Sequence, residues 1–521
     1  MPSTRRIPLL IALIGVLALS LWQLRADERG IVRESLHVGE TPVTVYRGGL
    51  DEPAPVILVA HGFAGSRRLM EPFALALAGS GYVVVTYDFL GHGRHPLPMR
   101  GDLGEQDGTS ALLIEQTAEV AEMALSLPGV EGGLALVGHS MATNILVRYA
   151  QEDPRVRATV GVSLFAPTID ASTPRNLLVI VGALEGRLEA EGRRVVAMRT
   201  GGDSESVASF TTYGDLSDGS ARRLVVSPRV EHVGVLYSAT TLDETRLWLD
   251  GVFEWEGVDP IANRAHGRGL WIALLMVCVF LLARPLATLL PRVAPTPGGA
   301  DATWKRLLLV AGLPALVTPF LLRPLPTGFL PVVVGDYLGV HFLAMGLFTA
   351  ALLWWTGGRP RMGRVLELAG VRGPGAFRLA LGAGGMVAFF LVLMAWPLDR
   401  FFTSFFPVAE RIPLMVAVLV GVLPYFLADE WLTRGTDPRR GAYAFTKVLF
   451  LLSLALAVAL DFQALFFLII IFPVVLIFFV VHGLFSRWAF RSTGSPLVAG
   501  LGNSMAFAWA IAVTFPMYAG G

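Results

Sequence analysis

The sequence predicts two structural classes within one chain: an α/β domain with a doubly wound, mostly parallel sheet, followed by an all-α bundle of transmembrane helices. The first observation is composition, because 54% of the 521 residues are hydrophobic and only 16% are charged, whereas an ordinary soluble domain carries about 25% charged residues. The second observation is that the apolar runs become much longer after about residue 268, and the third is that the net charge changes from negative to positive near the same point. Together they exclude a wholly soluble or disordered protein, and the single cysteine, Cys278, excludes an internal disulfide scaffold.

The change of charge separates residues 25–265 from residues 266–521. The first part holds 21 Arg, no Lys and 32 acidic residues, for a net charge of −11, and the second holds 19 basic and 9 acidic residues, for +10. An acidic part suits a soluble domain, and a basic, strongly apolar part suits a membrane domain. Neither has the clustered basic stripe of a nucleic-acid-binding surface, so no nucleic-acid partner is expected.

Residues 1–24 are predicted to form an N-terminal transmembrane anchor. Arg5 and Arg6 precede an apolar run that extends to residue 24, and its length is close to the ~20 residues that a helix needs to cross a bilayer. A cleaved signal peptide is the alternative, and it requires a small-x-small cleavage site. Because large or charged side chains at 23–25 come directly before Ala26, we expect the anchor to remain uncleaved.

Residues 30–260 alternate between short runs rich in β-branched residues and helical stretches. Runs of this kind suit strands that are buried on both faces, and the βαβα order predicts the parallel, doubly wound sheet. The predicted strands cover residues 56–60, 82–88, 134–138, 158–166, 176–182 and 222–227, and the predicted helices include 69–80, 108–127 and 141–152.

Residues 268–521 form a series of long apolar runs, which predict a polytopic transmembrane helical domain. With the N-terminal anchor the chain has about nine predicted spans. The spans after the anchor are expected near residues 269–290, 307–322, 330–356, 379–397, 412–428, 446–460, 463–482 and 496–518.

The basic residues of the connecting loops predict the orientation of these spans. If residue 1 is cytoplasmic, most of the Lys and Arg residues fall in the four cytoplasmic loops 291–306, 357–378, 429–447 and 483–495. The opposite loops contain only Arg323, Arg400 and Arg411. This is the positive-inside bias. We therefore expect a multi-pass protein of the cell (inner) membrane with its N-terminus in the cytoplasm and its α/β domain and C-terminus outside it.

A candidate nucleophile lies in the segment GHSMA (138–142), between a predicted strand and a predicted helix. A serine on such a sharp turn exposes its Oγ above the sheet, and the N-terminus of the following helix favours developing negative charge. Gly138 provides the small side chain that the crowded turn requires. The second small position is Ala142, which adds one methyl to the usual glycine. Ser140 is therefore the predicted nucleophile.

A serine hydroxyl needs a base, and the base needs an orienting carboxylate. His232 in VEHVGVL follows the last predicted strand and is the candidate base. With it, the three residues follow one another along the chain in the order serine, acid, histidine. For the acid, Glu185 follows the strand at 176–182 by a few residues. Its rivals are Asp170, which follows the strand at 158–166, and Asp215 or Asp218, which lie just upstream of the histidine.

Acyl chemistry also needs two hydrogen-bond donors aimed at the developing oxyanion. The backbone N–H of Met141 is the first predicted donor. The second is the N–H of Phe63 in HGFAG (61–65), which follows an early strand and whose glycines permit close backbone approach. Asp88, at the end of the next strand, is expected to hold the neighbouring loops in place.

With these segments in hand, residues of about 40–256 resemble the α/β-hydrolase superfamily. The matching pieces are HGFAG, YDFLGHGRH, GHSMA, VGALEG and VEHVGVL, in that order. The resemblance implies a serine hydrolase domain whose triad is Ser140, His232 and an acid, with no cofactor and no metal. Glu185 replaces the aspartate that is usual in the superfamily. Residues 94–113 are expected to form a small lid.

Ionisable residues inside the membrane part are also candidates for function. Asp429, Glu430 and Arg434, together with Phe478 and His482, faintly resemble the motifs of intramembrane prenyl-protein-type proteases. The first residue departs from that motif and a further downstream histidine motif is missing. We therefore interpret the glutamate and the arginine as an i,i+4 ion pair at the membrane interface.

One further span holds Asp336 and His341, which we interpret as making buried polar contacts.

These features predict a membrane-integrated serine hydrolase that cleaves carboxylic ester or thioester bonds, with lipid esters among the candidate substrates, outside the cytoplasm. The expected partners are the lipid bilayer and a small-molecule or lipid ester. One alternative is an acyltransferase with the same triad. Another is a transport or lipid-handling membrane protein with an accessory hydrolase domain, because a single anchor would suffice for simple tethering.

Overall fold

The computed structural model describes residues 3–49, 52–101, 108–256, 262–357 and 375–519. The chain divides into two compact units, which are treated separately. The α/β unit comprises Ile14–Leu275, Leu398–Ser404 and Pro516–Gly521, and the helical unit comprises Met1–Leu13, Met276–Pro397 and Phe405–Phe515.

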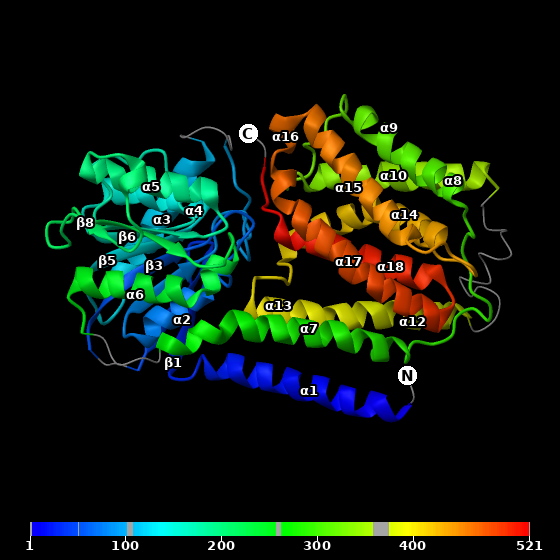
Figure 1. The fold of residues 1–521 in the computed structure, drawn as a ribbon, viewed down its shortest axis with the longest axis horizontal. Coiled ribbons are helices and arrows are strands. Elements are labelled where there is room, and N and C mark those ends of the chain that lie inside the picture. The colour runs from blue at the N-terminus through cyan, green and yellow to red at the C-terminus, as the bar shows by residue number, and fades with distance from the viewer. Residues whose placement is uncertain (1–2, 50–51, 102–107, 257–261, 358–374, 520–521) are drawn as a thin grey trace. The chain divides into compact units, whose positions relative to one another are not determined.

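The α/β unit is built on a nine-stranded sheet with the strand order β1-β2-β4-β3-β5-β6-β7-β9-β8 (Figure 1). The six neighbouring strands β4, β3, β5, β6, β7 and β9 pair in parallel. The pairs β1–β2 and β2–β4 at one edge and β8–β9 at the other are antiparallel. The strands are β1 (Ile31–Val38), β2 (Thr41–Gly48), β3 (Ala54–Ala60), β4 (Val83–Tyr87), β5 (Val130–His139), β6 (Val156–Val162), β7 (Leu177–Gly182), β8 (Thr212–Tyr213) and β9 (Arg222–Ser227).

Helices cover both faces of this sheet, as Figure 1 shows. Side chains alternate between the two faces, because successive residues of a strand point in opposite directions. In β3, Ile57 and Val59 pack with α2 and α6, whereas Val56 and Leu58 pack with α3 and α4. The helices are α2 (Glu71–Gly79), α3 (Thr109–Leu125), α4 (Met141–Glu152), α5 (Gly186–Thr200) and α6 (Ala239–Phe253).

The predicted mostly parallel α/β sheet is confirmed, and each of the six predicted strands has a counterpart. The prediction missed β1 and β2, which form an antiparallel edge. Strand β1 (IVRESLHV) is half exposed and carries charged residues, so it lacks the continuous apolar run that identified the central strands.

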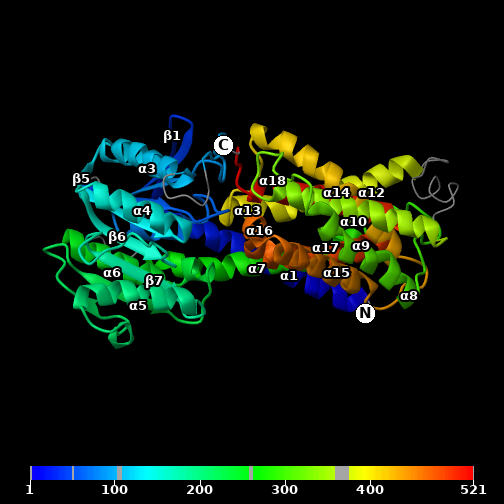
Figure 2. The same ribbon diagram turned by 90° about the horizontal axis from the view of Figure 1, so that it is seen from above.

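Nine helices of the described chain are long and apolar enough to cross a membrane. Most of their residues belong to the helical unit, whereas α1, α7 and α13 each contribute residues to both units. Helix α14 packs against both α10 and α18 (Figure 2). The helices are α1 (Ser3–Ala26), α7 (Arg268–Ala287), α8 (Trp304–Leu307) continuing through a π segment (Leu308–Gly312) into α9 (Leu313–Leu322), α10 (Gly335–Trp355), α12 (Gly375–Phe389) continuing through the π segment η5 (Phe390–Ala395) into α13 (Trp396–Phe401), α14 (Ile412–Thr433), α15 (Ala442–Leu460), α16 (Phe462–Leu465), α17 (Phe467–Thr493) and α18 (Pro496–Thr514).

The number of long apolar helices agrees with the predicted number of spans, but two predicted loops differ in structure. Residues 483–495 were expected to form a loop, whereas α17 continues to Thr493, so Arg487 and Arg491 lie on its last turns. Asp429 and Glu430 lie within α14. Most of the predicted loop 357–378, with four of its arginines, lies outside the described residues.

Candidate active site

Ser140 occupies the turn between β5 and α4, as the sequence predicts. Its backbone has φ 53° and ψ −118°, a strained conformation that non-glycine residues adopt when the surrounding structure fixes it. Its N–H donates to the carbonyl of Val162 at 2.9 Å, which anchors the turn to β6. A Cβ on Gly138 would approach the Leu146 side chain to 2.8 Å and the Ala142 backbone to 3.2 Å. The turn therefore requires glycine at 138 and accommodates the buried methyl of Ala142.

Ser140, His232 and Glu185 form one continuous hydrogen-bonded chain. His232 Nδ1 lies 2.5 Å from Glu185 Oε1, and His232 Nε2 lies 2.9 Å from Ser140 Oγ. Because a carboxylate only accepts hydrogen bonds, Nδ1 carries the proton and donates it to Glu185. Nε2 of the neutral ring is then the acceptor for the serine hydroxyl, which is the arrangement that a general base requires.

Glu185 is held rigidly in its orienting position. Its Oε2 accepts hydrogen bonds from the Gly182 N–H at 2.7 Å and from Ser163 Oγ at 2.8 Å. Burial alone would raise the pKa of Glu185, but the hydrogen bonds from His232, Gly182 and Ser163 hold it below its usual value. The acid side chain is only 6% exposed, whereas the His232 side chain is 44% exposed. The hydrogen-bonded chain therefore runs from a buried carboxylate through a partly exposed imidazole to the Ser140 hydroxyl.

The three rival acids of the sequence analysis serve local turns instead. Asp170 accepts four hydrogen bonds from Ser172 and Thr173. Asp215 accepts from the backbone and hydroxyl of Ser217, and Asp218 accepts from the Ser220 N–H. Their oxygens are thus engaged by neighbours in sequence, whereas Glu185 reaches across 47 residues to His232.

His139, which the sequence analysis set aside as a packing residue, contacts the base. Its Nε2 donates to the backbone carbonyl of His232 at 2.9 Å, and the two ring centroids are 4.8 Å apart. Burial lowers the pKa of His139 to about 3, so this ring is neutral at physiological pH. It acts as a fixed donor that holds the backbone of the base.

The loop HGFAG lies directly against the nucleophile. A Cβ on Gly62 would come within 3.0 Å of the Ser140 Cβ. Gly62 O accepts hydrogen bonds from His61 Nδ1 at 2.8 Å and from the Gly65 N–H at 3.0 Å, and His61 Nε2 accepts from the Phe89 N–H at 3.1 Å. These bonds fix the peptide that carries the Phe63 N–H beside Ser140, while Met141 begins α4 on its other side.

Asp88 ties two loops together, which confirms its predicted structural role. Its carboxylate accepts from the Arg67 N–H at 2.7 Å and from the Arg94 N–H at 3.0 Å, and it also pairs with the Arg67 guanidinium. Burial would raise the pKa of Asp88, but Arg67 and His61 hold it below its usual value.

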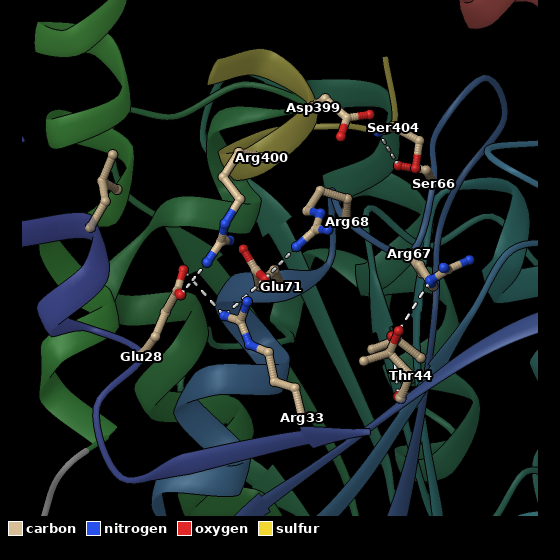
Figure 3. A network of polar contacts seen from close by, with 12 residues as sticks. Glu28, Arg33, Thr44, Ser66, Arg67, Arg68, Glu71, Asp399, Arg400 and Ser404 are labelled. Carbon is tan, nitrogen blue, oxygen red and sulfur yellow. Dashed lines mark hydrogen bonds and ion pairs between the residues drawn. The ribbon is translucent and has the colours of Figure 1, made fainter. Parts of the chain in front are cut away.

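Two segments from late in the sequence also support these loops, and the sequence analysis did not anticipate either. The first is Leu398–Ser404. The Ser404 N–H donates to Ser66 Oγ at 2.9 Å, and Thr403 Oγ1 lies 3.0 Å from the same hydroxyl (Figure 3). Arg94 pairs with Asp399 at 2.7 Å. Ser66 directly follows the HGFAG loop, so this segment braces the candidate oxyanion hole.

The second segment is the tail at 516–519. Its Met517 N–H donates to the Gly91 carbonyl at 2.8 Å, and its carbonyl accepts from the Met99 N–H at 2.9 Å. A Cβ on Gly91, where φ is +72°, would overlap the Met517 carbonyl. The described part of the predicted lid is therefore tied to the tail, whereas residues 102–107 of that lid lie outside the described residues.

A buried ion cluster lies beneath the same loops. Glu71 pairs with Arg33 at 3.0 Å and with Arg68 at 3.0 Å, and it also pairs with Arg268 (Figure 3). Burial would raise the pKa of Glu71, but these arginines hold it below its usual value. Glu28 joins the cluster through Arg33 and Arg268, and it also pairs with Arg400. The cluster thus connects α2 with the segment Leu398–Ser404.

Three large apolar side chains close in sequence to triad or α4 residues are exposed. Leu184 precedes Glu185 and is 71% exposed, Val233 follows His232 and is 36% exposed, and Phe165 is 62% exposed. The Phe165 N–H donates to Thr143 Oγ1 at 3.0 Å, which places the Phe165 backbone beside the first turn of α4.

Three supporting residues escaped the sequence analysis: Ser163, Ser66 and His139 in its positioning role. Ser163 follows β6 and has a φ of 53°, so it lies at the same carboxyl edge of the sheet as Ser140. A polar residue directly after a central strand is the pattern that could have identified it. Ser66 has no comparable pattern, because its partners lie more than 330 residues away in sequence.

The intramembrane candidates form a separate, closed polar cluster. Glu430 pairs with Arg434 at 3.0 Å and accepts from Asn503 Nδ2 at 3.3 Å, and Lys447 pairs with Asp429 at 2.5 Å. The predicted i,i+4 ion pair is confirmed, and its place at a membrane interface stays a prediction. Glu430 is fully buried within the helical unit and its partners are nearly so, because α14 packs between α10 and α18.

Asp336 and His341 make buried contacts of their own. Asp336 accepts from the backbone N–H groups of Phe329 at 2.9 Å and Tyr337 at 2.7 Å. His341 Nε2 lies 3.0 Å from Ser453 Oγ. Both observations confirm the interpretation of these residues as makers of buried polar contacts.

The family model described as "Serine aminopeptidase, S33" matches residues 51–200. No significant match was found among curated proteins. Similar solved structures include epoxide hydrolase VrEH1 from Vigna radiata (23% identity, 26% of this chain and 42% of that chain, TM-score 0.21). A hypothetical protein from Pseudomonas aeruginosa matches at 12% identity (43% and 94%, TM-score 0.32), and a membrane phospholipase A described as a bacterial virulence factor matches at 14% (48% and 95%, TM-score 0.29).

The chain spans about 41% of the length of the first epoxide hydrolase that it matches. The family match, the strand order and the strand–turn–helix position of Ser140 together define an α/β-hydrolase domain within this chain.

Proposed function

We propose that this chain is a membrane-integrated serine hydrolase that cleaves carboxylic ester or thioester bonds. The observation that carries the proposal is the unbroken hydrogen-bonded chain from Glu185 through the accessible His232 to Ser140. A serine in this arrangement is activated, because the proton that it loses has a positioned acceptor.

The proposed reaction proceeds in two steps. Ser140 Oγ attacks the acyl carbonyl while His232 Nε2 takes its proton, and the oxyanion is stabilised by the N–H groups of Phe63 and Met141. Glu185 stabilises the charged imidazole, which then gives its proton to the departing alcohol or thiol. In the second step water adds to the acyl-serine, His232 takes the water proton, and the acid is released as the proton returns to Ser140.

The exposed apolar residues next to the triad in sequence are proposed to form the mouth of the site and favour a substrate with an apolar acyl chain. Phe165, Leu184 and Val233 are exposed, and an apolar chain that covered them would remove their surface from water. A lipid ester has this character. The substrate class is therefore proposed to be an ester or thioester of a medium or long acyl chain.

The distribution of charge supports a site outside the cytoplasm. The positive-inside assignment places residues 398–411 and the C-terminus on the same side as the α/β domain. The contacts of Leu398–Ser404 and of the tail at 516–519 with the α/β unit agree with that assignment. Alkaline phosphatase fused after residue 265 should be active, and fused after residue 370 it should be inactive. The reverse pattern would move the proposed site to the cytoplasm.

The activity can be tested with purified, detergent-solubilised full-length protein. We expect hydrolysis of p-nitrophenyl decanoate with a higher kcat/KM than p-nitrophenyl acetate, and hydrolysis of a decanoyl thioester. Ser140→Ala should abolish all three reactions. Leu184→Ser should lower the preference for decanoate while leaving acetate hydrolysis nearly unchanged, because it removes apolar surface at the mouth and no reacting group.

Two results would change the proposal. Faster cleavage of leucine p-nitroanilide than of either ester would favour a peptidase. If added glycerol receives the acyl group in preference to water, the chain is an acyltransferase with the same triad, since the acyl-serine intermediate is common to both reactions.

A further inference from the structure

Ser163 directly follows β6 and has a strained backbone. It is 1% exposed and adopts the left-handed conformation, with φ 53°, and its N–H donates to the Ile180 carbonyl of β7 at 2.7 Å. Such a conformation costs a non-glycine residue free energy and persists where the surrounding structure fixes it, whereas glycine adopts it without strain. A buried serine at this position therefore indicates that its hydroxyl has a role.

The partner of that hydroxyl is the acid of the triad. Ser163 Oγ donates to Glu185 Oε2 at 2.8 Å, and the Gly182 N–H donates to the same oxygen at 2.7 Å. The other carboxylate oxygen, Oε1, lies 2.5 Å from His232 Nδ1. The two donors, which we call the acid cradle, fix one oxygen so that the other faces the imidazole.

Gly182 completes the acid cradle because it has no side chain. A Cβ at this position would lie 3.1 Å from Glu185 Oε2 and 2.5 Å from the Val230 carbonyl. The Gly182 carbonyl also accepts from the Glu185 N–H at 2.9 Å. The backbone and the carboxylate of residue 185 are thus held by the same residue, and the distance between them suits one length of side chain.

That length is the length of glutamate. An aspartate carboxylate lies one methylene closer to its backbone, a difference of about 1.5 Å, and hydrogen bonds stretched by this amount are lost. With its backbone held by Gly182, an aspartate at 185 is not expected to keep its bonds to both His232 and the acid cradle. The cradle therefore gives a physical reason for the glutamate that replaces the usual aspartate.

We propose that Ser163 is a positioning residue that acts through Glu185, and that the acid cradle restricts the acid of the triad to glutamate, a role that rests on the proposed serine hydrolase function. Glu185 must face His232 Nδ1 while Nε2 takes the proton of Ser140. Ser163 holds the carboxylate in that orientation and touches neither the substrate nor the nucleophile.

The first test compares two substitutions that both remove the hydroxyl but differ in backbone strain. In the full-length protein, Ser163→Ala and Ser163→Gly should each lower kcat for decanoate hydrolysis about tenfold, the effect of one hydrogen bond to a charged group, with KM nearly unchanged. Ser163→Gly should nevertheless unfold at a temperature at least as high as Ser163→Ala, because glycine tolerates the positive φ. If kcat recovers in Ser163→Gly, the residue serves the fold alone and the proposal fails.

A matched control removes a hydroxyl elsewhere in the α/β unit. Ser126 Oγ donates to the Met123 carbonyl at the end of α3. Ser126→Ala should therefore keep the wild-type kcat and KM.

A double-mutant cycle tests whether Ser163 acts through the acid. Adding Ser163→Ala to Glu185→Ala should cost less than about twofold in kcat, because the carboxylate that the hydroxyl holds is already gone. Glu185→Asp should lose at least as much kcat as Ser163→Ala. An equal loss from Ser163→Ala in both backgrounds, or full activity in Glu185→Asp, would overturn the proposal.

The last readout does not depend on turnover. It is the downfield proton NMR resonance of His232 Nδ1–H, identified by its loss in His232→Ala. Ser163→Ala should shift or broaden this resonance, and Ser126→Ala should not. If the wild type cleaves no ester and takes up no fluorophosphonate while the resonance still responds to Ser163→Ala, the proposed hydrolysis fails and the acid cradle still positions His232. If the wild type is active and neither the resonance nor kcat responds, the hydrolase function stands and the positioning role is wrong.

Discussion

The triad of the α/β unit and the ion cluster of the helical unit are both networks of polar side chains, but they end differently. The triad runs in one direction, from a buried carboxylate to a partly exposed base and a hydroxyl at the surface. In the ion cluster of the helical unit both carboxylates are paired inside the bundle, Asp429 with Lys447 and Glu430 with Arg434. Chemistry with an external substrate requires an accessible reactive atom, which only the first network provides.

This comparison explains why a charged motif inside a membrane domain is weak support for catalysis. A buried charge must be paired whatever its role, so the pairing of Glu430 with Arg434 follows from burial alone. His482 belongs to neither network, since its ring is buried among aromatic side chains such as Phe390 and Phe478.

The largest expected effect is on the triad. Ser140→Ala or His232→Ala should lower kcat for decanoate hydrolysis by about 10⁴–10⁶, because nucleophile and base act as a unit. Glu185→Gln should cost less, since the base remains and loses only its orientation. Asp170→Asn is the matched control, because that carboxylate serves a local turn. If Asp170→Asn inactivates the protein while Glu185→Gln does not, the acid is assigned incorrectly.

The sequence predicted that Ser140, Glu185 and His232 meet, because each follows a recognisable local pattern at the end of a strand. Ser140 lies in GHSMA, Glu185 follows the strand that becomes β7, and His232 follows β9. Parallel strands bring their carboxyl ends to one edge of the sheet, so the order of the motifs was enough to predict the observed contacts.

Two features could not be predicted in this way: the support of the loop at Ser66 by the segment Leu398–Ser404, and the burial of the ion pairs of the helical unit. Ser66 and Ser404 are separated by 338 residues, and no local pattern connects them. The sequence analysis assigned Lys447 to a loop because a charged residue lowers the local hydropathy and is then expected to be exposed. In the structure its side chain is only 5% exposed and pairs with Asp429. Only the packing of α15 with its neighbours decides that outcome.

The second largest effect is expected in the ion cluster, on stability and not on chemistry. Lys447→Met should destabilise the helical unit by about 3–5 kcal/mol, because it leaves Asp429 buried without its partner. Thermal unfolding in detergent measures the loss, and the double variant Lys447→Met/Asp429→Leu should recover much of it. The kcat per fluorophosphonate-reactive site should be unchanged in both. A parallel loss of kcat in the folded fraction would mean that the cluster takes part in the reaction.

A smaller effect is expected at the loop against the nucleophile. Gly62→Ala places a methyl about 3 Å from the Ser140 Cβ and the His139 carbonyl, so the loop or its neighbours must shift by a few tenths of an ångström beside the candidate oxyanion site. Because a misplacement on the order of 1 Å can cost about 10²-fold in rate, we expect a severalfold loss. Steady-state kinetics should show the loss in kcat, with KM much less affected. Gly186→Ala, where an added Cβ meets open space, should retain activity.

The smallest effect concerns the pH dependence of stability. The pKa of Glu71 is held below its usual value in the folded state, so its ion pairs stabilise the fold fully above about pH 4.3, the usual glutamate value. That contribution is lost as the pH falls through the lower folded value. The unfolding temperature of the wild type should therefore fall as the pH is lowered below about 4.3.

Glu71→Gln should unfold at a lower temperature at neutral pH and show a flatter pH profile, whereas Glu34→Gln, on the exposed side of β1, should keep the wild-type profile. An unchanged profile in Glu71→Gln would mean that the arginine cluster is not linked to acid stability.

The central claim is that Ser140 is an activated nucleophile, and the most direct measurement is the mass of a fluorophosphonate adduct on the purified full-length protein. One phosphonyl group should be found on the peptide that contains Ser140. Ser140→Ala should give no adduct, and His232→Ala should label far more slowly, because the hydroxyl has lost its base. A full adduct on Ser140→Ala, or an adduct on another serine in the wild type, would contradict the account.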